Sequence, residues 1–243
     1  NYEAAEVFDG MVRHIENASN AEEIYEGAML TLTGGGVGYW RVNTQYESEN
    51  TFDQVIRVDA IPDPLSVLID PYCRKPDCSD AQWAVLYEDM PQDRFETKYP
   101  AEANAARDGD FSEMKLAENF IRVMEYFERN NATEWLYEIT DAQGRVSYFR
   151  KSRDGQEAVD IAKMAWEDSQ AKDDGLCRRR KVGVATISWY KIANGRVIEE
   201  TQWAGKYIPI VRVTAVERVK DGKLDRKGMV RFMKDAQRMY NYN

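Results

Sequence analysis

The sequence predicts an α+β fold, with antiparallel β-hairpins, a meander and amphipathic helices packed on the sheet. Runs of alternating apolar and polar residues, separated by glycine-containing turns, indicate the hairpins. Apolar residues at helical period occupy segments of their own, which indicates helices segregated from the strands. With 243 residues, of which 43% are hydrophobic and 12% aromatic, the chain can bury a substantial core.

Two helices are expected at the start of the chain. The first is predicted over Glu3–Glu16, because apolar residues recur there at helical period: Ala5, Phe8, Val12 and Ile15. Ser19 and Glu22 form a capping box that predicts the start of the second helix, and Gly34 is expected to end it. Its inward residues are expected to be Ile24, Ala28 and Leu32.

The stretch Val55–Leu86 is expected to organise the rest of the chain as the nucleus of a sheet. It contains three apolar runs that predict strands, Val55–Val58, Val67–Ile69 and Trp83–Leu86. Pro62 and Pro64 end the first run, since proline fixes φ and removes an N–H donor. Asp70 and Pro71 end the second run in a turn, ahead of an acidic loop.

The middle of the chain alternates between helix, loop and strand. Pro91 is expected as the first residue of a short helix, Gln92–Tyr99, and the polar segment Ala101–Glu113 as a surface loop. Phe120–Arg129 fits either a helix or a strand by its apolar spacing, and we choose a strand because the next segments form a meander. A hairpin turn at Asp141–Gly144 should then join two further strands, Trp135–Ile139 and Arg145–Phe149.

The last third of the chain should contain two helices and further hairpins. Glu157–Lys172 is predicted as a helix with one inner face, formed by Ala158, Ile161, Ala162 and Ala165. The expected strands are Leu176–Ile192 (one strand or two), Arg196–Trp203 and Tyr207–Val219. Turns are predicted at Asn194-Gly195 and Asp221-Gly222. The helix from Gly228 onward should pack one face on the sheet, with an apolar side of Val230, Met233 and Met239.

Charge and hydropathy exclude several classes of function. The net charge of −9 disfavours binding of nucleic-acid phosphates over the whole surface, although a local basic patch stays open. The sequence has neither an apolar run near 18 residues nor a signal-peptide pattern, so we expect no membrane partner.

No motif in the sequence points to catalysis, and we expect neither an enzyme nor a cofactor. His14 has no accompanying serine or cysteine motif. The glycine run Gly34–Gly38 lacks the Gly-Lys-Ser/Thr of a phosphate loop and precedes a strand, so a flexible helix-to-strand turn is the preferred interpretation. Cys73, Cys78 and Cys177 lack the spacing of a zinc site and are expected as reduced thiols.

Three aspartates in the acidic loop, Asp70, Asp77 and Asp80, allow two interpretations. Carboxylates in one loop could hold a hard cation, but their spacing does not match a calcium loop. An aspartate side chain in a turn can also accept a hydrogen bond from the backbone N–H two residues later. This interpretation explains the three aspartates as well as a cation or better. We therefore assign no metal ligand.

One dense basic cluster, Arg178, Arg179, Arg180 and Lys181, is the candidate nucleic-acid contact. In a strand, alternate residues point to opposite faces, so at most half of the cluster shares a side. Contact with phosphate is one interpretation; a solvated strand edge, where charges block stray pairing, is the preferred one.

Three blocks in this order resemble the portal proteins of tailed bacteriophages, of the type found in short-tailed phages. The first block is Val55–Leu86, with its proline corners and acidic loop; the second is Tyr207–Val211, similar to an Ile-Pro-Ile-Val strand of that family. The third is the helix from Gly228, similar to the family's helix that leads toward its stem. The matching residues of that helix include Arg231, Lys234, Asp235, Gln237 and Arg238.

The resemblance implies a structural role at the unique vertex of a phage capsid. Residues 1–227 would be a wing-like α+β domain, and residues 228–243 the start of a helix toward a stem. Because the chain begins at Asn1 and ends inside a helical pattern, we expect a piece of a longer protein. The cysteine pair in the acidic loop departs from the family pattern.

The partners implied by the resemblance are other portal subunits in a dodecameric ring, capsid and tail factors, and double-stranded DNA that passes through during packaging and ejection. Contact with the terminase motor is not expected of these residues. The expected location is the virion, after synthesis in the cytoplasm of the bacterial host. Two other classes stay open: a stand-alone acidic interaction domain, and a metal-dependent enzyme that uses the aspartate loop.

Overall fold

The computed structural model has an α+β architecture, as the sequence predicts, and it describes residues 2–100, 120–141, 143–172, 176–193, 195–221 and 223–242. Strands form a three-stranded sheet in the order β2-β1-β9, a six-stranded sheet β3-β4-β5-β7-β8 with β6 on β5, and a small hairpin, β10-β11. Neighbouring strands in these described sheets run antiparallel.

The three-stranded sheet carries the two N-terminal helices. Its elements are α1 (Tyr2–Ala18), α2 (Ala21–Gly35), β1 (Val37–Tyr46), β2 (Gln54–Ile61) and β9 (Ile210–Thr214). Both helices are confirmed where the sequence predicts them. Ala28 and Leu32 of α2 are buried against the sheet, whereas α1 has no buried residue.

Both ends of α2 differ from the predicted caps. Asn20 precedes the helix in the left-handed region (φ 50°), and no side chain caps it. The Ser19 hydroxyl instead accepts a hydrogen bond from the Val58 N–H (3.0 Å), so it serves the edge of β2. The helix ends at Gly35 rather than Gly34, because the cap residue is Gly36, which has positive φ (89°) and whose N–H bonds the Leu32 carbonyl.

The six-stranded sheet begins after a short 3₁₀ turn, η1 (Pro64–Ser66). Its strands are β3 (Val67–Ile69), β4 (Trp83–Pro91), β5 (Phe120–Thr140), β6 (Val146–Phe149), β7 (Cys177–Ala193) and β8 (Arg196–Trp203). The three strands predicted in Val55–Leu86 exist, but they do not start one sheet. The proline corner takes the chain from β2 in the first sheet to β3 and β4 in the second.

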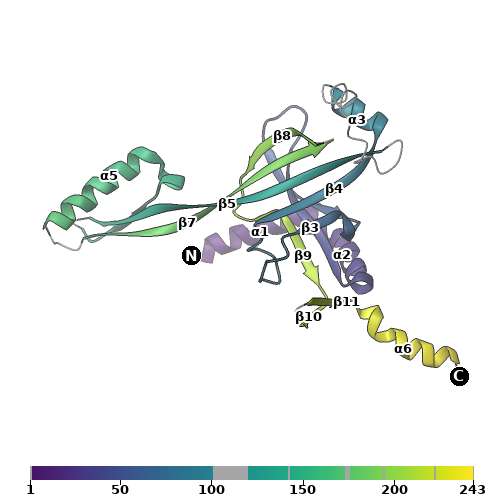
Figure 1. The fold of residues 1–243 in the computed structure, drawn as a ribbon. Helices are drawn as coiled ribbons and strands as arrows, with labels where there is room; N and C mark the ends of the chain where they lie inside the picture. Colours follow the sequence, from purple (N-terminus) through teal and green to yellow (C-terminus); the bar gives the residue numbers. More distant parts are fainter. Residues whose placement is uncertain are drawn as a thin grey trace.

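The longest strands, β5 and β7, form one continuous ladder. The choice of a strand at Phe120–Arg129 is confirmed, but the separate strand predicted at Trp135–Ile139 is wrong, since β5 runs through both segments. Residues between them stay paired because β7 lies alongside throughout, from Val123↔Ala193 to Ile139↔Cys177. Figure 1 shows this ladder leaving the body as a narrow ribbon that ends beside α5.

We call the distal part of this ribbon, with β6 and α5 (Lys151–Lys172), the arm. The predicted helix Glu157–Lys172 is confirmed, and it follows a break at Gly155, where φ is 84°. Ala162 is buried, but Ile161, predicted on the same inner face, is 64% exposed. The helix is therefore turned so that the half-buried Trp166 and the buried Ser169 face the ribbon.

Two predicted hairpins are confirmed by register. Thr140 pairs with Val146 across the β5–β6 turn, where Gly144 has φ 78°. Ala193 pairs with Arg196 across the β7–β8 turn, where Gly195 has φ 72°. Asn194 and Gly222 lie outside the described residues, as does the predicted loop at 101–113.

The end of the chain departs from prediction in two ways. The strand predicted at Tyr207–Val219 is divided into β9 and β10 (Val216–Lys220), which pair in different sheets. The helix α6 (Met229–Tyr242) follows β11 (Lys223–Lys227) but does not pack on the sheet, because none of its residues is buried. Figure 1 shows α6 extending away from the body beyond α2.

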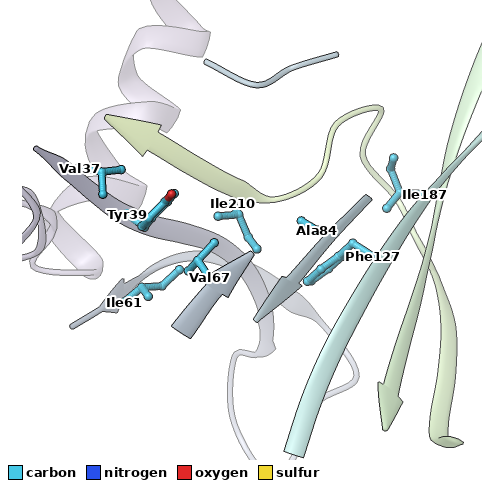
Figure 2. Packing of buried hydrophobic residues seen from close by; sticks show 8 residues of the cluster. All are labelled: Val37, Tyr39, Ile61, Val67, Ala84, Phe127, Ile187 and Ile210. Atoms are coloured by element: carbon cyan, nitrogen blue, oxygen red, sulfur yellow. The ribbon is translucent and has the colours of Figure 1, made fainter. Parts of the chain in front are cut away.

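The core lies where the two sheets meet. It contains eight buried residues, contributed by β1, β2, β9 and four strands of the larger sheet: Val37, Tyr39, Ile61, Val67, Ala84, Phe127, Ile187 and Ile210. Figure 2 shows these side chains between strands of both sheets. A second cluster seats the short helix α3 (Gln92–Lys98), whose Phe95 is fully buried. Pro91 precedes α3 as its cap instead of being its first residue.

Helix α2 packs closely on β1 at Gly38. A Cβ atom placed there would overlap the carbonyl oxygen of Ala28 in α2. We predict that Gly38→Ala lowers the free energy of unfolding by at least about 2 kcal/mol, because the backbone of α2 must move. Gly183→Ala in β7 is the matched control, since its Cβ would meet no atom within 4 Å. Equal denaturation midpoints for the two variants would contradict the packing of α2 on β1.

Candidate functional site

A cleft of about 950 Å³ lies between the two sheets. At its centre the Glu125 carboxylate of β5 accepts two hydrogen bonds, from the Arg41 guanidinium of β1 and from the indole N–H of Trp189 (both 2.9 Å). Arg41 also approaches Asp59 on β2, at 3.6 Å. The contact between Arg41 and Glu125 joins the two sheets across the cleft, and the two hydrogen bonds use both oxygens of the glutamate.

Lys191 of β7 also lines the cleft. Its ammonium lies over the rings of Trp189 and Tyr99 and donates to Glu199 (3.2 Å). Burial lowers the pKa of Lys191, but hydrogen bonds to Tyr99 and Glu199 outweigh burial and leave the pKa raised. A lysine with a raised pKa is held as a cation, which suits a structural contact and not a nucleophile.

The acidic loop between β3 and β4 is built from Asp-capped turns, as the preferred interpretation expected. Asp70 is buried and accepts from the N–H groups of Tyr72 (2.9 Å) and Gln82 (3.0 Å). Asp80 accepts from the N–H of Arg74 (2.8 Å), which lowers the pKa of Asp80. Asp77 accepts from the N–H of Ser79 (3.2 Å), with the same effect on its pKa. The carboxylates thus point at backbone N–H groups.

The same loop holds the cysteine pair. All three cysteines of the chain are free thiols, and the sulfur atoms of Cys73 and Cys78 lie 2.9 Å apart. Burial, together with the contact to Cys73, raises the pKa of Cys78 to about 12. In the part of the chain that the structure describes, no three His, Cys, Asp or Glu side chains gather as a metal-binding group.

The basic cluster lies at the distal end of β7, in the arm. β8 pairs with β7 only from Ile187 onward, so Arg178–Lys181 border an edge of the ribbon that β8 does not cover. The four side chains are exposed and alternate between its faces. Arg179 and Lys181 face α5, which leaves Arg178 and Arg180 together on the opposite face.

Arg179 holds the arm together, a role that sequence reasoning missed. Its guanidinium lies between two indole rings, 3.6 Å from the centroid of Trp166 in α5 and 4.5 Å from that of Trp135 in β5. The ammonium of Lys181 adds a contact to Trp135 at 5.4 Å. Cation–π contacts of this kind fix α5 to the ribbon without a large apolar core. No local sequence signal joins residues so far apart.

His14 and the glycine run Gly34–Gly38 are the two other candidates from the sequence. His14 is exposed on α1. The glycine run ends α2 and lets β1 pass close to it, so its backbone serves packing. Gly228 makes a matching approach, since a Cβ there would lie 2.5 Å from the carbonyl oxygen of Gly34. This glycine contact sets where α6 leaves the body.

Exposed apolar faces are the remaining surface feature. On α1, Phe8 is 66% exposed and lies one helical turn from the exposed Val12. On α6, Met233 is 67% exposed. The polar residues that match the family motif are exposed as well: Arg231, Lys234, Asp235, Gln237 and Arg238. None of the described helices is long and apolar enough to cross a membrane.

Exposed apolar helix faces such as those of α1 and α6 are typical of a protein that works through contacts with other chains. The comparison with protein families agrees with this class. A family model described as "Phage P22-like portal protein" matches residues 1–243. The chain therefore belongs to the P22-like phage portal protein family, whose members are structural proteins of the bacteriophage virion associated with DNA packaging.

The Arg179 contacts make a testable prediction about the arm. Arg179→Ala should speed amide hydrogen exchange in α5, residues 156–172, roughly tenfold, because two cation–π contacts are together worth about 1–2 kcal/mol. Arg178→Ala removes the same charge one residue away on the other face and should leave exchange in α5 unchanged. Similar exchange rates in the two variants would show that the indole–guanidinium contacts do not hold α5.

Proposed function

We propose that this chain is part of a portal ring at the unique vertex of a phage capsid, and that the ring is the conduit for double-stranded DNA during packaging and ejection. The match of the portal family model to residues 1–243 carries the proposal. Residues 1–227 would form the wing-like domain, and the helix from 228 would lead toward a stem.

The exposed surfaces support association with further copies of the chain. Phe8 and Val12 on α1 and Met233 on α6 expose apolar side chains to water. Exposure of a whole apolar helix face is unfavourable, so such faces usually mark contacts with other proteins. The arm adds a projecting element that can reach beyond one subunit (Figure 1). Capsid and tail factors are the other partners that this role requires, and terminase contact is not assigned to these residues.

The negative net charge of the chain suits the wall of a channel through which DNA slides. A net charge of −9 repels phosphates and disfavours tight binding over the surface. Arg178 and Arg180, on the face of the arm away from α5, are the residues of the basic cluster that we propose for any local phosphate contact. The proposed location is the virion, after synthesis in the host cytoplasm.

Electron microscopy of the protein made from its complete reading frame tests the proposal. We expect closed rings with a central channel. Phe8→Asp should reduce the fraction of rings, because it places a charge on the exposed face of α1. Phe52→Asp is the matched control, since Phe52 is 95% exposed in the loop between β1 and β2 and belongs to no helix face. Monomers at all protein concentrations would contradict the ring, and equal ring fractions in the two variants would remove α1 from the subunit contact.

A further inference from the structure

The cysteine pair in the acidic loop places two thiol groups in direct contact. The Cys73 and Cys78 sulfurs are 2.9 Å apart, which is less than the contact distance of two non-bonded sulfur atoms and within 1 Å of the roughly 2.05 Å of a disulfide. Cys177 is a free and buried thiol in the arm, where it pairs with Ile139 of β5.

The loop backbone holds both cysteines in place before any bond forms. The Cys73 N–H bonds the Asp70 carbonyl (3.3 Å), and the Cys78 N–H bonds the Lys75 carbonyl (3.0 Å). Asp80 accepts from Arg74 between the two cysteines, so one carboxylate braces the turn that brings the sulfurs together. Cys78 itself adopts a left-handed conformation (φ 52°), which L-residues rarely do without support from their surroundings.

The loop is also held by a neighbouring strand of the larger sheet. The Arg129 guanidinium of β5 donates to the Ser79 carbonyl (2.7 Å), beside Cys78. Arg212 of β9, in the three-stranded sheet, lies close enough to Cys78 to influence its thiol electrostatically. A covalent bond between Cys73 and Cys78 would therefore stiffen a loop that is already anchored on β5.

We propose that Cys73 and Cys78 form an intramolecular disulfide when the protein meets a disulfide oxidant such as oxidised glutathione. Cys73, the more exposed of the two, attacks one sulfur of the oxidant and releases one molecule of reduced glutathione. The sulfur of Cys78 then displaces the second glutathione from Cys73. The two cysteines lose two protons and two electrons, and the oxidant is reduced to two thiols.

The proposed site is a redox-sensitive disulfide, called the staple below, and it is separate from the portal function. In a reducing cytoplasm the pair stays as thiols, and in an oxidising medium the bond closes. The staple acts on the loop between β3 and β4 and leaves the cleft and the arm as they are. Its presence does not depend on whether the chain forms rings.

Mass spectrometry on the protein made from its complete reading frame tests the proposal. After treatment with oxidised glutathione, the peptide holding Cys73 and Cys78 should lose two hydrogens and resist alkylation, while Cys177 remains a thiol. The melting temperature should rise by a few degrees, because a short covalent loop restricts the unfolded chain. Amide exchange over residues 71–81 should slow.

Cys73→Ser is the control, because it removes the more exposed thiol and leaves the buried one in place. Under the same treatment this variant should show no two-hydrogen loss and no rise in melting temperature. Cys177→Ser should behave as the wild-type protein. A wild-type protein that stops at a glutathione adduct on Cys73, or that pairs Cys73 with Cys177 or with another copy, would overturn the proposal.

Discussion

The rest of the structure depends on the uninterrupted ladder between β5 and β7. On one face of this ladder, Phe127 and Ile187 belong to the core between the sheets. Farther along the same face, Trp135 and Arg179 form the surface on which α5 packs. With 21 residues, β5 spans about 65–70 Å at the usual rise of a strand. The body and the arm are thus two ends of one element, and the alternation of side chains in that element determines which residues serve each end.

The local elements were predictable from sequence to a large extent, because they depend on near neighbours. Glycine turns set the register of the hairpins at Gly144 and Gly195, and apolar spacing indicated α1 and α2. The partition into two sheets was not predictable, since Pro62 and Pro64 mark a corner without saying which strand lies beyond it. Ile161 shows the same limit: helical period predicts a face, but only the tertiary partner decides which side of the helix is covered.

The functional surfaces were likewise predictable only where they depend on near neighbours in the sequence. Asp-capped turns in the acidic loop were foreseen because an aspartate acts on N–H groups a few residues away. The pairing of Arg179 with Trp135 and Trp166, and of Glu125 with Arg41, joins residues from separate elements and left no local signal. The basic cluster is recognisable in the sequence by its charge. The sequence does not show that two of its residues, Arg179 and Lys181, pack on the indole rings of the arm. The family resemblance, confirmed over residues 1–243, supplied what no single motif could: a structural role in a phage portal.

Because the ladder is continuous, it should hold body and arm as one unit. Double electron–electron resonance between spin labels at Glu200 in β8 and Lys163 in α5 measures this most directly. The labels can be attached through a non-natural keto side chain, so that the native cysteines are left untouched. A single narrow distance distribution is the result that a continuous ladder predicts. A broad or two-peaked distribution would show that the ribbon bends between Arg129 and Trp135, and would contradict the account.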